Sequence, residues 1–265
     1  MWPSPFVGGQ SFRRALQVKP GVSRTKMKSI RIKSHEEFEK LLTSIASDTV
    51  TATIHWRLHQ ELWAAKADWT REMAQSWTFW SLTIIAHYEV ALVRLGRLYD
   101  EHEGALSLAR LLATIEDNLE VFDEPAFRER LKGNPFVDSL ASTARRPDGA
   151  ILSDDRRLVV GSDPLVAKLV AARDKAVAHR DPRVVLGTLP NPSLALASSD
   201  LQELLDRAGQ IANRYTHLFR ASVYSMNMVG ADDFKTVLGY VRTGLARHED
   251  LIQEELARLS KGGAG

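Results

Sequence analysis

The sequence predicts an all-α protein. Apolar residues recur at spacings of three and four along most of the chain, which is the period of a helix with one buried face. Capping residues stand where these segments begin, such as Ser34 with Glu37, and Asp163 before Pro164. With 265 residues, 44% of them hydrophobic, the chain can bury a core without the disulfides that its lack of cysteine excludes. We expect an up-and-down helical bundle with extra short helices.

The individual elements follow from the same periodicity. The first helix contains a β-branched run at 49–54, which lowers its intrinsic propensity there. The second contains Trp77 and Trp80 on its apolar face, and we expect both to anchor the core. The helices are expected at 34–63, 68–101, 107–119, 125–132, 135–144, 164–181, 199–230 and 232–259.

Residues 145–161 break this pattern. Ile151-Leu152 and Leu158-Val159-Val160 flank the polar run 153–157. Two short apolar segments around a polar turn are typical of a β-hairpin. The sequence therefore predicts a small hairpin near 151–160 as the single strand pair of the protein.

The first 33 residues differ in composition from the rest. They carry eight basic residues and no acidic one, so within an overall charge of +2 the remaining chain carries −6. We expect a disordered basic tail over 1–33, then a single helical domain over 34–265 with a C-terminal helical extension at about 231–259. For the tail, a nucleic-acid arm, a transit peptide and a native start at Met27, with 1–26 outside the native protein, stay open.

The rest of the composition excludes several classes of protein. His55 and His59 are four residues apart, a spacing that can hold a metal, but no acidic residue or Cys stands at ligand spacing with them. We expect these histidines on a solvated helix face. The longest uncharged run, 73–88, is shorter than the roughly 20 apolar residues of a spanning helix. We expect no metal, no cofactor and no membrane segment, in a cytoplasmic protein.

The most unusual polar content lies in residues 172–181, Ala-Arg-Asp-Lys-Ala-Val-Ala-His-Arg-Asp. Arg173, Asp174 and His179 stand on an otherwise apolar helix, which Pro182 is expected to end near Asp181. RNA cleaves itself when its 2′-hydroxyl loses a proton and attacks the neighbouring phosphate. An imidazole can move that proton near neutral pH, and a guanidinium can stabilise the phosphorane. A structural interpretation stays open, because a helix C-terminus favours His and because Arg173 can pair with Asp174.

These residues resemble the Arg–polar…His motif of the HEPN superfamily of helical RNases. The longer string, Arg-Asp-Lys and then Ala-His-Arg-Asp, is similar to the abortive-infection U-type branch of that superfamily, a group tied to bacterial phage defence. An upstream piece resembles a helix and turn of the same branch: Trp80, Leu92, Leu95, Arg97-Leu98-Tyr99-Asp100 and Leu106-Ser107-Leu108. The resemblance spans roughly residues 77–181. It implies a HEPN-like bundle and a metal-independent endoribonuclease that limits phage spread by cutting host or phage RNA.

The resemblance also implies roles for five residues. Arg173, His179 and Asp174 would be catalytic, with Asp174 orienting one of the other two or bonding to a partner chain. Lys175 and Arg180 would bind the substrate. A local excess of nine basic over six acidic residues across 145–183 points to a phosphate-facing surface.

The spacing of the motif bears on the assembly. Arg173 and His179 are six residues apart, which puts them about 120° apart around a regular helix. They would meet only if the helix unwinds near His179, before Pro182, or if a second subunit completes the site. The resemblance implies a homodimer with a composite cleft, RNA as the substrate, and an antitoxin or regulator as a further candidate partner. The alternative is a catalytically silent HEPN-like scaffold for nucleotide binding or dimerisation.

Overall fold

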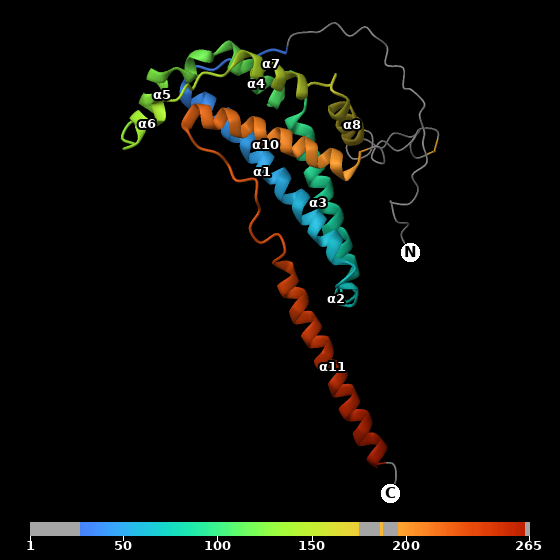
Figure 1. Ribbon diagram of the computed structural model, residues 1–265. Helices are drawn as coiled ribbons and strands as arrows, with labels where there is room; N and C mark the ends of the chain where they lie inside the picture. Colours follow the sequence, from blue (N-terminus) through green and yellow to red (C-terminus); the bar gives the residue numbers. More distant parts are fainter. Residues whose placement is uncertain (1–26, 175–185, 188–195, 263–265) are drawn as a thin grey trace.

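Three long helices form the body of the molecule (Figure 1). A computed structural model describes residues 27–174, 186–187 and 196–262. Helices α1 (His35–Ala65) and α3 (Trp77–Leu98) lie antiparallel, and α10 (Ser198–Arg220) packs along α1 in the opposite direction. The described residues contain no strand, so the all-α prediction is confirmed.

Helix α1 begins where the capping pattern predicts. The Ser34 hydroxyl accepts a hydrogen bond from the Glu37 N–H, while the Glu37 carboxylate accepts one from the Lys33 N–H at 2.7 Å. In the β-branched run, the hydroxyls of Thr49 and Thr53 donate to the carbonyl oxygens four residues earlier. Both hydroxyls are thereby hydrogen-bonded within the helix. Residues 49–54 are helical despite the low helix propensity of their β-branched side chains.

The helix expected over 68–101 is broken. It consists of α2 (Thr70–Ala74) and α3, which begins at Trp77. Around the break, the N–H groups of Gln75 and Ser76 bond to carbonyls three residues earlier, so the last turn tightens and α3 starts in a new direction. As a result Trp77 is 47% exposed, and the prediction that it anchors the core is wrong.

Small helices cover the end of the bundle where α1 begins. They are α4 (Leu108–Asp117), the 3₁₀ turn η1 (Leu119–Phe122), α5 (Glu124–Arg130) and α6 (Val137–Ala141). Under them, the rings of Phe38, Phe122 and Phe219 pack with centroids 5.0 to 6.0 Å apart. Residues 27–33 also lie here: the Ile30 N–H donates to the Thr114 hydroxyl of α4.

The hairpin predicted near 151–160 is a helix instead, α7 (Gly149–Leu158). The Asp148 side chain accepts from the N–H groups of Ala150 and Ile151, which caps a helix start rather than a strand turn. The polar run also faces inward at one position, since the buried Asp155 carboxylate binds Arg214 and accepts a hydrogen bond from Tyr215 of α10 at 2.9 Å. The prediction failed because this partner lies about sixty residues away in the chain.

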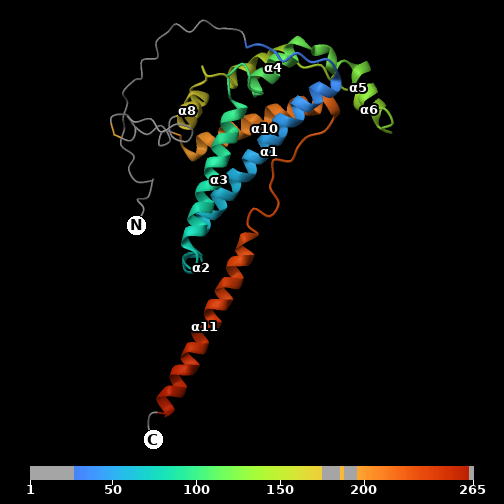
Figure 2. The ribbon, with the colours of Figure 1, turned by 180° about the vertical axis from the view of Figure 1, so that it is seen from behind.

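The C-terminal part departs from the bundle. Helix α10 ends at Arg220, before the expected Gly230, because Ala221 adopts a left-handed conformation with φ of 55°. Residues 222–233 then run back beside α1, where the Asn213 amide exchanges two hydrogen bonds with the Tyr224 backbone. Helix α11 (Phe234–Gly262) starts beside α2 and extends away from the bundle, as both views show (Figures 1 and 2).

Among the residues that the structure describes, no helix has the length and apolar character needed to cross a bilayer.

Candidate active site

The helix that leads into the motif, α8 (Pro164–Ala172), is fixed at its start. The Asp163 carboxylate accepts from the N–H groups of Leu165 and Val166, so it caps the helix as predicted. Its other oxygen binds Arg207 of α10 at 3.1 Å. Val166, Leu169 and Ala172 are buried at helical spacing. The last turn of α8 is thereby held against the bundle, beside the end of α3.

Arg173 follows directly after α8 and reaches across to α3. Its Nε donates to Asp174 Oδ1 at 2.6 Å. Its Nη1 donates to the Gly96 carbonyl at 2.9 Å and to Asp100 Oδ2 at 3.3 Å. The Arg173 side chain is 19% exposed. The guanidinium is therefore placed by two carboxylates and one backbone oxygen, from two elements far apart in the chain.

The Gly96 carbonyl is one of the last four of α3, which have no regular partner within a helix. A cation at this position also interacts favourably with the helix dipole. Arg173 thus caps α3. The structural interpretation of this residue was a pairing with an Asp, and Arg173 makes that pairing with Asp174.

Only a glycine fits at position 96. A Cβ built there would lie 2.4 Å from Arg173 Cδ, well inside van der Waals contact. Gly96 is buried within α3, where glycine otherwise costs helix stability. The small residue is therefore explained by the close approach of the Arg173 side chain.

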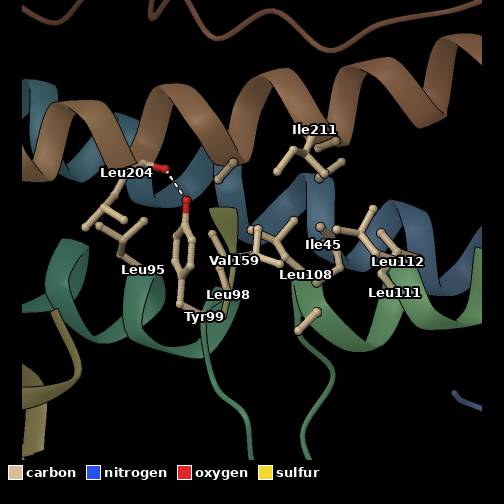
Figure 3. Close-up of a cluster of buried hydrophobic side chains, with 14 of the residues drawn as sticks. Ile45, Leu95, Leu98, Tyr99, Leu108, Leu111, Leu112, Val159, Leu204 and Ile211 are labelled. Carbon is tan, nitrogen blue, oxygen red and sulfur yellow. Dashed lines mark hydrogen bonds between the residues drawn. The ribbon is translucent and has the colours of Figure 1, made fainter. Parts of the chain in front are cut away.

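The turn after α3, which Tyr99 anchors in the core (Figure 3), holds Asp100 in position. The Asp100 Oδ1 accepts from the His102 N–H at 2.9 Å, while its Oδ2 faces Arg173. The preceding residue, Tyr99, is fully buried and donates its hydroxyl to the Leu204 carbonyl of α10 at 2.7 Å. Burial raises the pKa of Tyr99, so the hydroxyl stays a neutral donor.

The electrostatics of this site favour a permanent cation. Burial acts to lower the pKa of Arg173, but hydrogen bonds and charges from Asp174 and Asp100 raise that pKa above its ordinary value. Within the described part of the chain, the hydrogen bonds of Arg173 use Nε and Nη1. Nη2, which carries two N–H donors, makes no hydrogen bond to the described residues.

The structure brings together two of the five residues assigned from sequence, Arg173 and Asp174. The other three, His179, Lys175 and Arg180, lie outside the described residues. The sequence reasoning missed two contributors, Gly96 and the pairing of Asp100 with Arg173. A glycine inside a strongly helical pattern was the signal that could have pointed to a close contact there.

The charge count over residues 145–183 predicted a cationic surface. In the first half of this segment, the basic side chains are instead bound by other groups of the protein. Arg145 is buried and donates to the carbonyl oxygens of Leu140 and His217. Arg156 pairs with Glu116, and Arg157 pairs with Asp154. These side chains are held by protein groups, so charge counting along the sequence overstated the positive potential of this segment.

The histidines of α1 and α3 form a cluster of their own. His55 Nδ1 and His87 Nδ1 share a hydrogen bond at 2.8 Å. His59 hydrogen-bonds the Ile84 carbonyl at 3.0 Å and stacks on Trp56. Burial lowers the pKa of all three. The described residues include no group of three or more potential ligands arranged for a metal. The solvated face expected for His55 and His59 is in fact half-buried.

Comparison with known proteins agrees with the geometry. A family model described as AbiU2, of the HEPN AbiU2 family, matches residues 35–237. The match begins at the first residue of α1 and includes α3, α8 and Arg173. No curated protein and no solved structure matches the chain. Because the family model covers more than half of the 265 residues, the chain belongs to the HEPN AbiU2 family.

Proposed function

We propose that this protein is a metal-independent endoribonuclease of phage defence, with Arg173 and His179 as its main catalytic residues. The observation that supports the proposal best is the placement of Arg173. Its guanidinium is held by Asp100, Asp174 and the Gly96 carbonyl, so its remaining N–H groups have a defined direction. A positioned cation of this kind suits a transition state in which charge builds on phosphate oxygens.

The proposed reaction is an internal transfer within the RNA. The imidazole of His179 takes the proton of a 2′-hydroxyl, and the 2′-oxygen forms a bond to the adjacent phosphorus. The bond from phosphorus to the 5′-oxygen breaks, that oxygen takes a proton from water, and His179 then gives up its proton to the hydroxide left behind. Arg173 stabilises the five-coordinate phosphorane, with Asp174 orienting the guanidinium. Lys175 and Arg180 bind flanking phosphates. The products carry 2′,3′-cyclic phosphate and 5′-hydroxyl ends.

A second copy of the chain is part of the proposal. If the helix continued regularly past α8, Arg173 and His179 would lie about 120° apart, so a second subunit would complete the site at each phosphate. A two-fold axis beside α8 would bring two such pairs into one cleft. An antitoxin or other regulator that covers this face would block the cleft.

The test is a cleavage assay on a mixed RNA pool in EDTA. Wild-type protein should produce 2′,3′-cyclic phosphate ends, and Arg173→Ala and His179→Ala should each lower the rate by about 100-fold or more. Arg157→Ala removes an exposed, Asp154-paired guanidinium away from the site and should keep the wild-type rate. Cleavage that persists in both site variants would refute the assignment.

One observation favours the second candidate, a catalytically silent scaffold for nucleotide binding or dimerisation. Arg173 is largely buried and caps α3, a role that needs no chemistry. In that case Arg173→Ala would lower the melting temperature, and folded wild-type protein would leave the RNA pool intact. The cleavage assay and a melting curve on the same samples separate the two functions.

A further inference from the structure

The chain reverses direction between α1 and α3 without the residues that usually end helices. Residues 66–76 contain neither Gly nor Pro, and most of them are good helix formers. Helices often end on a residue with a left-handed backbone, but Lys66 after α1 and Gln75 after α2 both keep right-handed helical φ and ψ. The local sequence therefore does not explain why the helix breaks here.

Two residues of this segment depart from the helical conformation. Trp69 before α2 has φ of −124° and ψ of 27°, and Ser76 before α3 has φ of −145° and ψ of 56°. Neither side chain caps the helix that follows it. The packing of α1 against α3 requires the chain to reverse, but it does not select these two positions. The path of residues 66–76 therefore depends on contacts from another part of the chain.

One arginine of α11 contacts this segment at three points. Arg242 Nε donates to Glu72 Oε1 at 2.6 Å, and Arg242 Nη2 donates to the Asp68 carbonyl at 2.9 Å. The guanidinium carbon also lies 3.9 Å from the centroid of the Trp69 ring. The Glu72 side chain is 5% exposed, so Arg242 pairs with a nearly buried carboxylate. Helix α2 and the break at Trp69 are thereby both held by α11.

The apolar part of the contact is small. Leu238 of α11 is buried with Met73 of α2 and Ala65 of α1, and the Phe234 and Trp80 rings pack beside them. A region with few buried apolar contacts opens locally at a lower free energy than the main core does. We therefore expect the contact between α11 and α2 to open while the bundle stays folded.

We propose that α2 and the first half of α11, residues 234–245, form one cooperative unit, in which the docking of α11 holds α2 and its two breaks in place. When α11 leaves, residues 66–76 lose the contacts that fix their path. Opening also uncovers Met73 and Trp80 beside the exposed Trp77, so this end of the bundle gains apolar surface. This conformational device lies at the opposite end of α3 from the candidate active site (Figure 1), and it does not depend on RNA cleavage.

Hydrogen exchange of the full-length protein, read by mass spectrometry, tests the unit. Arg242→Ala removes three contacts that α11 makes with residues 66–76. We expect the amides of this segment to exchange about tenfold faster or more, since that is the usual effect of losing hydrogen bonds to a charged group. Arg247→Ala is the matched control, because Arg247 is similarly exposed and pairs with Glu254 of the same helix. It should leave the exchange of residues 66–76 unchanged.

A reciprocal variant distinguishes a cooperative unit from a local weakening. Met73→Ala changes α2 alone, yet one unit should make residues 66–76 and residues 234–245 exchange faster by the same factor. Amides in the middle of α1 and α3 should keep their wild-type rates, which reports that the bundle is folded. Faster exchange of residues 66–76 alone in Met73→Ala would overturn the proposal, as would equal exchange of that segment in Arg242→Ala and Arg247→Ala.

Discussion

Arg173 caps the C-terminus of α3 through the Gly96 carbonyl and pairs with the carboxylates of Asp100 and Asp174. The proposed function gives the same guanidinium a second role, at a phosphate of the RNA. The cap holds the side chain still, because three acceptors fix two of its nitrogens. In the proposed enzyme, the hydrogen bond from Arg173 to the Gly96 carbonyl would therefore orient the guanidinium toward the phosphate.

Gly96→Ala tests whether cleavage depends on the position of Arg173, because it adds one methyl group beside that side chain. The added Cβ would lie 2.4 Å from Arg173 Cδ, so the arginine must leave its place. We expect RNA cleavage to fall by about tenfold or more, since displacements near 1 Å at a reacting centre can cost up to 100-fold. The helix itself gains propensity from alanine, so circular dichroism should show a folded protein.

The control for that variant is Gly239→Ala in α11. It is also a glycine within a helix, but no atom lies within 4 Å of the position that its Cβ would take. Cleavage by this variant should equal that of the wild type. If Gly96→Ala cleaves RNA as fast as Gly239→Ala does, the position of Arg173 does not matter to the reaction.

At the scale of the element, helix starts could be predicted and several helix ends could not. Ser34, Ser107 and Asp163 cap through groups two or three residues away, so their signal is local in the sequence. The end of α10 depends on the left-handed backbone of Ala221. Alanine rarely adopts this conformation, so the sequence does not predict a helix end there. Gly230, which was expected to end that helix, has a positive φ but lies ten residues later.

The same limit applies to the candidate site. The motif that contains Arg173 was recognisable because its residues are close in sequence. The contacts that position the guanidinium, at Gly96 and Asp100, come from more than seventy residues earlier. No sequence spacing relates Gly96 and Asp100 to Arg173. Only the packing of α8 against α3 brings these residues together.

Helix α7 is the element that differs most from its prediction, a β-hairpin, and its residue Asp155 allows a direct test. Asp155 is 4% exposed and binds both Arg214 and Tyr215, so Asp155→Ala leaves the half-buried Arg214 and the buried Tyr215 hydroxyl without their partner. We expect the free energy of unfolding to fall by about 1–3 kcal/mol. In the hairpin first predicted, Asp155 would lie in an exposed turn and its loss would be nearly neutral.

The neighbouring Asp154 is the matched control. Its side chain is 61% exposed and pairs with Arg157 on the surface. Asp154→Ala should change the free energy of unfolding by less than about 1 kcal/mol. Chemical denaturation of both variants in the same buffer measures the difference, and equal values would contradict the helical assignment.

At the scale of the whole molecule, the contact between α1 and α3 makes stability depend on pH. His55 and His87 face each other through their Nδ1 atoms at 2.8 Å, so one donates and the other must accept without a proton. Burial lowers the pKa of both in the folded state, and the nearby charges of Arg94 on His55 and of His55 and His59 on His87 act in the same direction. The fold therefore favours the neutral imidazoles.

The sign of the effect follows from proton binding. Below the ordinary histidine pKa of 6.5 the unfolded chain binds protons that the folded chain does not. The free energy of unfolding should be constant above that pH and fall as pH drops through the lowered folded values. Melting temperatures from pH 8 to pH 5 measure it. His87→Gln should flatten the decline, while replacing the exposed His248 of α11 should not, and equal slopes for the two would contradict the explanation.

The parts of the molecule are separated along its length (Figure 1). Helices α4 to α7 close the core at one end, the end of α3 beside α8 carries the candidate active site, and α11 extends from the far end.

The most direct test of the central claim is chemical rescue of His179→Ala by imidazole in EDTA, with 2′,3′-cyclic phosphate ends as the readout. If His179 moves the proton beside a positioned Arg173, the variant is nearly inactive. Added imidazole then restores cyclic-phosphate formation, with a rate that follows the neutral imidazole fraction. The double variant with Arg173→Ala should not be rescued. Cyclic phosphate formed equally by wild type and His179→Ala, with or without imidazole, would contradict the proposed catalysis.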